Sequence, residues 1–523
     1  MTGMISLPRT RLAVKGLQLF WTLLAVWYEH VVFIYHVGRC VWPDSDIAPT
    51  KASARPTHVL LVADPQILDH RSYPGRAPSL TYISQLLVDL NLRKSWRAAL
   101  RTRPDVVVFL GDMMDGGRFS MSDAEYEEYF QRFQSIFPLD QGIPRYFIPG
   151  NHDTGLGISD HFSKKAGARY ESHFGPLNSH VTISNHTIIF LDATSLVEED
   201  LQRLGQGNTY RDWPPVPGGS VEFVQQFSKS GNQDPIMLFT HIPLSRPDGA
   251  SCGPSRERGT IRRGAGFGYQ NTLGKATSEF LLSVLRPSVV FSGDDHDYCE
   301  YTHSLDNAGM SIRAREVTVK SMSMAMGIRR PGFQLLSLVP PHSSQGRFSH
   351  ADSLCLLPDQ LGIYLATYIP FLVLSLFIIF SANIHRICSR RKGQRRTALS
   401  LATSPSSTPL SGVLRSRRPI DSDEWLQYPS ETDADILPRP TSSLSTKAPR
   451  PMYSQTFVLF GRRRRITIGT ESLASLFRSV FSCCGNQDVP KSRGFAAGVL
   501  YDVRDVAVFP LAIFGAFSWW MFR

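Results

Sequence analysis

Short apolar runs in the first two thirds of the chain end in residues that bind metals. The run at residues 289–291 is followed by Ser-Gly and then by four polar residues, Asp294-Asp295-His296-Asp297. Apolar runs of this length, bounded by such residues, are typical of short buried strands. Acidic side chains crowded at the end of a strand repel one another unless a cation lies among them. This stretch therefore predicts a metal site.

The same order of apolar run and polar residue recurs four times upstream. The runs and the residues that follow them are 58–63 with Asp64-Pro65-Gln66, 106–110 with Gly111-Asp112, 146–148 with Gly150-Asn151-His152-Asp153, and 236–240 with His241. A single Asp or His in such a place is more often a cap or a structural residue. Five strand ends that each deliver Asp, Asn or His predict a polynuclear metal centre.

Helical periodicity separates these strands between residues 56 and 340. Residues 80–100 carry Leu and Trp at helical spacing, and residues 124–137 place four aromatic side chains on one face. Those aromatic residues are more typical of a core than of a ligand site. Strands that alternate with helices indicate an α/β layered domain.

Two long apolar stretches flank this domain, at residues 16–36 and 361–384, and a third covers residues 506–522. The basic N-terminus (residues 1–15) predicts a signal anchor, with its start in the cytosol and residues 38–360 (core 55–345) in the lumen. Glu29 and His30 interrupt the first stretch, so a buried amphipathic helix is the alternative. The third stretch is short, and it is either transmembrane or interfacial.

Much of the net charge of +11 comes from basic residues after position 385. Residues 385–505 are basic and rich in Ser, Thr and Pro, which indicates a largely disordered cytosolic loop. No nucleic-acid-binding module accompanies the charge, so we expect no nucleic-acid partner. The luminal segment holds four cysteines that allow one or two disulfides of unreadable pairing, and one glycosylation sequon at Asn185-His186-Thr187.

The candidate ligands combine carboxylate, amide and imidazole groups without cysteine, a donor set that suits Mn, Fe or Zn rather than a structural zinc site. Asp112 offers two oxygens that can bridge two cations, and two such cations stabilise the attacking and leaving oxygens of a phosphoryl displacement. The ligands expected from the residues alone are Asp64, Asp112, Asn151, His241, Asp294 and His296.

His152 directly follows Asn151 and precedes Asp153. This position puts an imidazole near the metals, with a carboxylate next to it in the sequence. We expect His152 to be the general acid that protonates the leaving alkoxide, and Asp153 to orient it.

In their order, these motifs resemble the calcineurin-like metallophosphoesterase superfamily. The resemblance implies a four-layer α/β/β/α sandwich with a centre of two divalent metal ions at the strand ends. Two residues depart from the family's pattern, because Gln66 and Asp294 stand where histidines are usual. Both can ligate through oxygen, so the resemblance adds Gln66 to the expected ligands and favours a harder metal such as Mn.

The segments ADPQ, GDMMDGGR, GNHD, THIPLSR and FSGDDHDYCEY are similar to those of a membrane-bound branch of this superfamily, over about residues 55–345. That branch consists of the phosphodiesterases that remodel GPI anchors in the endoplasmic reticulum and early Golgi. The resemblance implies removal of ethanolamine phosphate from a mannose of the GPI glycan, which aids export of GPI-anchored proteins. It also implies a GPI glycolipid or GPI-anchored protein as substrate, the lipid bilayer, and p24-type cargo receptors as partners.

Arg118 and Arg246 lie in two of these segments and are candidates for holding the phosphate, since Arg suits bidentate contact. A structural arginine is the alternative for each. Two other functions stay open: a membrane-bound phosphoesterase for another phosphoprotein or lipid phosphate, and an inactive trafficking or scaffold protein on the same fold. Gln66 and Asp294 are the residues that argue for inactivity.

Overall fold

The computed structural model describes residues 9–47, 55–157, 161–307, 310–341, 348–402, 453–459, 462–468 and 495–522. One compact unit comprises Met1–Arg386 and Val499–Arg523, and a second comprises Ile387–Gly498. In the second unit, β14 (Tyr453–Leu459) pairs with β15 (Arg462–Ile468) in antiparallel fashion. Most of the predicted cytosolic loop, residues 385–505, lies outside the described residues. The catalytic motifs all fall in the first unit.

Two β-sheets form the centre of the first unit. The five-stranded sheet has the order β13-β12-β1-β2-β3, and the six-stranded sheet has the order β10-β11-β9-β6-β5-β4. The first sheet consists of β1 (Thr57–Val62), β2 (Val106–Phe109), β3 (Arg145–Phe147), β12 (Gly332–Leu338) and β13 (His350–Leu356). The second consists of β4 (Ser179–Ile183), β5 (His186–Leu191), β6 (Ile236–Thr240), β9 (Val289–Ser292), β10 (Cys299–Asn307) and β11 (Met310–Thr318).

Alternate side chains of the central strands face opposite layers. In β1, Leu60 belongs to a buried cluster with Trp96 of a covering helix, whereas Leu61 belongs to a second cluster with Phe239 of the other sheet. Strands with apolar residues on both faces are typical of sheets buried on both sides. The two sheets therefore pack against each other, and each also packs against helices.

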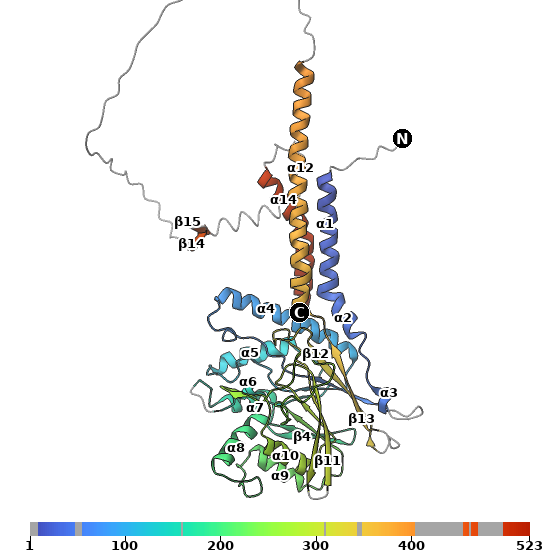
Figure 1. Ribbon diagram of the computed structural model, residues 1–523, viewed down its shortest axis with the longest axis vertical. Coiled ribbons are helices and arrows are strands. Elements are labelled where there is room, and N and C mark those ends of the chain that lie inside the picture. Colours follow the sequence, from blue (N-terminus) through green and yellow to red (C-terminus); the bar gives the residue numbers. More distant parts are fainter. Residues whose placement is uncertain are drawn as a thin grey trace, which may run out of the picture. The chain divides into compact units, whose positions relative to one another are not determined.

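Six helices form the two outer layers. They are α4 (Pro78–Ala99), α5 (Asp123–Ile136) and α7 (Ala166–Phe174) on the first sheet, and α8 (Ala193–Gly205), α9 (Ser220–Ser228) and α10 (Lys275–Leu285) on the second. The predicted α/β/β/α architecture is confirmed, as are the helices expected near residues 80–100 and 124–137 (Figure 1). Tyr126 and Phe133 of α5 are buried in the core, as the aromatic pattern indicates.

Within the described residues, three helical segments are long and apolar enough to cross a membrane: Arg11–Val37, Gln360–Ser389 and Phe495–Phe522. The first comprises α1 (Arg9–Val26), a π-helical turn η1 (Trp27–Val31) and α2 (Val32–Val37). The second begins with α11 (Gln360–Ile363) and the turn η4 (Tyr364–Tyr368), and continues into α12 (Ile369–Ala402). Hydrogen bonds join α1 to the other two, from Trp21 Nε1 to Ser375 Oγ (2.9 Å) and from Gln18 Nε2 to Asp505 O (3.0 Å).

The third segment, α14 (Phe495–Phe522), begins well before the predicted residue 506. The apolar stretch begins at residue 506, but the helix also includes the charged residues before it. Asp502 Oδ2 accepts a hydrogen bond from Asn383 Nδ2 (2.7 Å), and Arg504 pairs with Asp505 (2.7 Å). The resulting helix of 28 residues exceeds the length of about 20 that a bilayer requires.

Two disulfides involve the four cysteines of the predicted luminal segment. Cys40, just after α2, is bonded to Cys355 in β13, and Cys252 is bonded to Cys299 at the start of β10. The first of these bonds fastens the end of the first membrane segment to the edge of the five-stranded sheet.

Candidate metal centre

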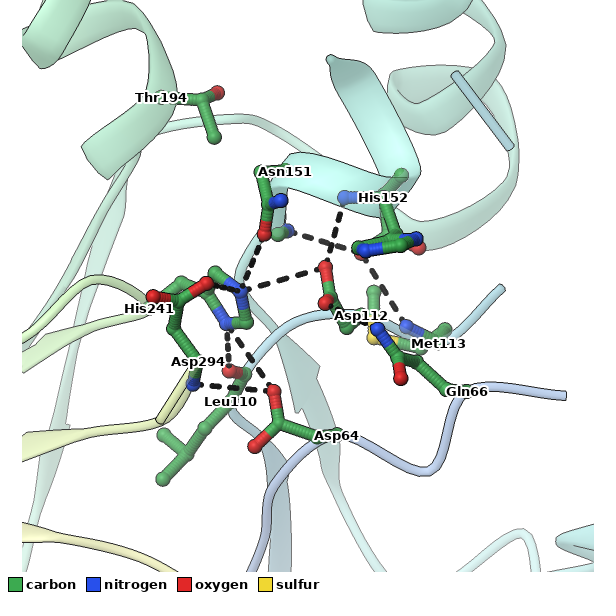
Figure 2. A network of polar contacts seen from close by, with 12 residues as sticks. Asp64, Gln66, Leu110, Asp112, Met113, Asn151, His152, Thr194, His241 and Asp294 are labelled. Atoms are coloured by element: carbon green, nitrogen blue, oxygen red, sulfur yellow. Dashed lines mark hydrogen bonds and ion pairs between the residues drawn. The ribbon is translucent and has the colours of Figure 1, made fainter. Parts of the chain in front are cut away.

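The metal-type residues meet at the carboxyl ends of the central strands, where open α/β sheets commonly bind ligands. Asp64 and Asp112 follow β1 and β2, while His241 and Asp294 follow β6 and β9. Asn151 begins the short helix α6 (Asn151–Thr154) just after β3. Figure 2 shows the side chains of these residues turned toward one another.

The backbone at this centre is strained. Among the described residues other than glycine, nine have a positive φ, and five of these nine are predicted ligands: Asp64 (46°), Gln66 (35°), Asp112 (54°), Asp294 (64°) and His296 (67°). Such conformations cost on the order of 1–3 kcal/mol each and cluster at functional sites. Here they turn neighbouring side chains toward a common point.

Glycines next to the ligands permit a close approach between segments. A Cβ atom on Gly111 would lie 2.2 Å from His241 Nδ1, and one on Gly150 would lie 2.1 Å from Asp112 Oδ1. No side chain fits at such distances. The Gly-Asp and Gly-Asn pairs of the motifs are therefore required by packing at the centre.

His241 lies at the middle of the first ligand group. Its Nδ1 donates to Leu110 O (2.7 Å), which leaves Nε2 facing Asn151 Oδ1 at 3.2 Å, Asp112 Oδ1 at 3.3 Å and Asp294 Oδ1 at 3.6 Å (Figure 2). A backbone carbonyl that fixes the proton on Nδ1 is typical of metal-ligating histidines. The lone pair on Nε2 then points at three acceptor oxygens, an arrangement that a cation would stabilise.

Asp64, Asp112 and His296 form the second group, with ligand atoms all within 4.8 Å of one another. Asp64 is fully buried, and its Oδ2 has no hydrogen-bond partner among the described residues. Burial raises the pKa of Asp64 well above its usual value, and Asp112 and Asp294 add to this effect against the opposing influence of His241. An unpaired buried carboxylate is costly unless a cation binds it. The residues present therefore fit a second metal position.

Asp112 belongs to both groups, as a bridging ligand would. Gln66 Nε2 donates to Asp112 Oδ2 (2.7 Å), so Gln66 also lies at the centre. The structure thus brings together all seven residues that were expected as ligands: Asp64, Gln66, Asp112, Asn151, His241, Asp294 and His296.

His152 lies beside this centre. Its backbone N donates to Asp112 Oδ1 (2.9 Å), and its Nδ1 lies 2.7 Å from Asp115 O and 3.1 Å from Asp115 Oδ1. Burial lowers the pKa of His152, but Asp112 and Asp115 outweigh it and raise that pKa to about 9. These two carboxylates favour the protonated imidazole, which is the form that a general acid needs.

The structure corrects the role expected for Asp153. Its carboxylate accepts hydrogen bonds from the backbone N of Gly150 (2.9 Å), Met113 (3.3 Å) and Met114 (3.1 Å). Asp153 thus caps α6 and holds the neighbouring loop, and Asp115 is the carboxylate that orients His152. Asp115 was not among the predicted site residues, although it lies only three residues after Asp112 in the same loop.

The two candidate arginines have different surroundings. Arg118 Nη1 donates to Gly268 O (2.9 Å) and Asn151 O (3.3 Å), so this side chain borders the centre. Arg246 is 2% exposed, and its Nη2 pairs with Glu316 Oε2 at 2.8 Å. The interactions of Arg246 favour a structural arginine over a phosphate ligand.

Comparisons with known proteins agree with this geometry. Residues 57–298 match the family model described as calcineurin-like phosphoesterase. The chain is 34% identical over 368 residues to Cell division control protein 1 of Saccharomyces cerevisiae, covering 67% of this chain and 71% of that protein. It is 26% identical over 330 residues to the Metallophosphoesterase 1 homolog of Drosophila melanogaster, covering 60% and 80% of the two chains.

Among solved structures, the chain is similar to a dimetal phosphatase from Danio rerio, with a TM-score of 0.34 and 15% identity over 58% of this chain and 100% of that one. The family model covers the strands and loops that carry all the ligands but none of the three apolar helices. The match to the yeast protein extends well beyond that region. This chain belongs to the calcineurin-like metallophosphoesterase family and is a metal-dependent phosphoesterase.

Proposed function

We propose that this phosphoesterase removes ethanolamine phosphate from a mannose of the GPI-anchor glycan. The observation that carries the phosphodiesterase chemistry is Asp112, which is shared by two ligand groups and contacts the backbone of His152. The choice of the GPI glycan rests on the similarity of the motif segments to the membrane-bound branch. Such trimming would aid export of GPI-anchored proteins through p24-type cargo receptors.

The residues of the centre divide the reaction among them. Two divalent cations, when bound, polarise the phosphoryl oxygens and activate the water that attacks phosphorus. His152 donates its proton to the sugar oxygen as that oxygen leaves, and Asp115 keeps the imidazole in place. Arg118, whose Nε is buried without a partner among the described residues, holds the phosphate.

We propose Mn²⁺ as the metal. Asp294 offers a carboxylate, and Gln66 an amide without a ligating nitrogen, where the family usually has imidazole nitrogen. Sites with few nitrogen ligands suit harder cations than zinc. His241 and His296 are then the only nitrogen ligands among the seven residues.

Several features support a luminal position in the endoplasmic reticulum or early Golgi. Both disulfides lie between the first two membrane segments, and disulfides persist in oxidising compartments. Asn185 of the glycosylation sequon is exposed in the turn between β4 and β5, where a glycan has room. Three candidate spans agree with a multi-pass membrane protein.

The test uses the full-length protein in detergent after its metal has been removed and restored. Release of ethanolamine phosphate from a GPI glycan is measured with Mn, with Zn and without metal. We expect release that needs Mn, falls about a hundredfold in His152→Ala, and is kept in His70→Ala, an exposed histidine whose side chain is 61% accessible. Metal binding without release of ethanolamine phosphate would indicate that the substrate is a phosphoprotein or another lipid phosphate. A protein that binds no metal would be an inactive scaffold.

A further inference from the structure

A cluster of cations lies where the membrane segments reach the layered domain. Helix α4 lies on the side of the layered domain that the membrane segments meet (Figure 1), and its side chains contact Glu29 of η1 and Trp520 of α14. The C-terminal half of α4 and the turn after it carry Arg93, Lys94, Arg97 and Arg101. Their spacing of three to four residues places them along one side of a helix.

One of these cations is neutralised. Lys94 Nζ pairs with Glu29 Oε2 at 2.7 Å, and both side chains are buried. The other oxygen of Glu29 accepts a hydrogen bond from Tyr368 Oη (2.8 Å). This pair explains the charged residue that interrupts the first apolar stretch, and it leaves Glu29 without capacity to neutralise the remaining arginines.

Arg97 reaches the end of α14. Its Nη2 donates to Trp520 O (2.9 Å), and the guanidinium lies 4.4 Å from the centre of the Trp520 ring. An arginine at a helix C-terminus satisfies free carbonyls and interacts favourably with the helix dipole. This contact uses only part of the guanidinium, because Nη1 is buried with no hydrogen-bond partner among the described residues.

A cavity of about 130 Å³ opens between these elements, with His30, Lys94, Arg97, Arg101 and Trp520 on its wall. That volume is roughly ten times what one water molecule needs. Glu29 is its only acidic residue, and Lys94 already pairs with it. In the described part of the chain, no carboxylate lies within 4.0 Å of the guanidinium of Arg97 or Arg101. The cavity therefore has the charge and the unpaired donor that an anion requires.

The position of the cavity identifies the source of that anion. Its wall includes the last turns of two candidate membrane spans, and tryptophan at such a place is typical of the membrane interface. The other half of α4 exposes apolar side chains, with exposed fractions of 55% at Leu80, 67% at Tyr82 and 49% at Ile83. Exposed apolar side chains can enter the headgroup region of a bilayer while nearby Lys and Arg side chains contact anionic lipid.

We propose that α4 lies along the leaflet next to the layered domain, and that the cavity binds the phosphate of an anionic phospholipid headgroup there. Arg97 and Arg101 are the phosphate ligands. The proposal depends on the membrane segments and not on the substrate assigned to the metal centre. A bound headgroup would fasten α4, and with it the loop from Asp64 to α4, at a set height above the membrane.

The experiment measures lipid bound to the full-length protein by native mass spectrometry, after delipidation in detergent. Phosphatidylinositol, phosphatidylserine and phosphatidylcholine are added separately, and inorganic phosphate is added as a competitor. The variant is Arg97→Gln/Arg101→Gln, and the matched control is Arg103→Gln, which removes an exposed charge from the same segment outside the cavity. The unfolding temperature and the metal content report whether each variant is folded.

We expect one anionic phospholipid per chain, bound about tenfold more weakly by the double variant and unchanged in the control. Equal binding by wild type and double variant would overturn the proposal. Inorganic phosphate that binds with the same dependence on both arginines, while lipid does not bind, would also overturn it. If the double variant fails to fold, Arg101→Gln alone gives the same test, because no hydrogen bond joins Arg101 to α14 among the described contacts.

Discussion

The metal centre and the cationic cavity concentrate charge of opposite sign in different ways. At the metal centre, buried carboxylates come from loops that each follow a strand of one layered domain. At the cavity, cations of α4 and the turn after it meet the ends of two membrane segments, which are hundreds of residues apart from each other in the sequence. Like charges held close together disfavour one another's charged forms, and a bound ion of the opposite sign removes this cost. Both regions are therefore binding sites, for cations in one case and for an anion in the other.

The largest effect is expected at the ligand shared by both metal positions. Asp112→Ala should lose both metals and reduce turnover to less than about one thousandth, because the cations provide most of the catalysis. Metal content and phosphodiesterase rate are measured together. Asp248→Ala, an exposed carboxylate with 77% accessibility, is the control and should change neither. Full activity in a metal-free Asp112→Ala protein would refute the metal centre.

The general acid should be separable from the metals. His152→Ala is expected to reduce the rate about a hundredfold while the metal content stays unchanged. Asp115→Asn should reduce it about tenfold, since it orients the imidazole without contacting substrate. Asp153→Asn should instead lower the unfolding temperature. A larger rate loss in Asp153→Asn than in Asp115→Asn, at equal stability, would restore Asp153 as the orienting residue.

The buried ion pair beside the cavity should affect stability and not chemistry. Glu29→Gln leaves Lys94 buried without its partner and should reduce the free energy of unfolding by about 3 kcal/mol. Glu29→Gln/Lys94→Met should recover most of that loss. Arg55→Gln, which breaks the exposed pair with Asp105, should cost less than about 1 kcal/mol. Thermal unfolding checks all three, and a loss of bound metal in Glu29→Gln would show that the two regions are coupled.

Acid should lower the free energy of unfolding of the layered domain through His350 of β13, which lies outside both the metal centre and the cavity. Burial lowers the pKa of His350 to about 4, and the nearby His186 contributes to the shift. In the unfolded chain His350 binds a proton near pH 6.5, whereas in the folded chain it does so only near pH 4. The contribution of His350 to the free energy of unfolding is therefore fully present above pH 6.5, and it is lost as the pH falls toward 4. The loss should be about 1 kcal/mol at pH 5.5, and smaller in His350→Gln. Unfolding of metal-depleted protein at pH 7.5 and 5.5 checks this without a contribution from metal release.

The strands, and the meeting of the candidate ligands at one sheet edge, were predictable because their signals are local. An apolar run predicts a buried strand, and a polar residue directly after it lies at the sheet edge where the other ligands also gather. The position of Asp294 at the centre was predictable even though the family usually has histidine there. The pairing of the cysteines and the start of α14 were not readable, because each depends on contacts between distant segments.

The wrong prediction for Asp153 and the structural role of Arg246 both have physical causes. Asp153 is adjacent to His152 in the sequence, but it is the third residue of a short helix, and side chains there commonly turn back to the N-cap backbone. Arg246 resembles a phosphate ligand in sequence, yet its partner Glu316 lies on a strand 70 residues later. The cavity could not be predicted from the sequence, since its walls come from three segments that are far apart along the chain.

The left-handed backbone at Asp64, Gln66, Asp112, Asp294 and His296 bears on how such a centre changes over evolution. The backbone conformation at these positions determines the direction in which each side chain leaves the main chain, whichever residue type is present. The same backbone can then present histidine, aspartate or glutamine to the centre. Metal preference in this architecture is therefore adjustable by single substitutions, without redesign of the loops that hold the metals.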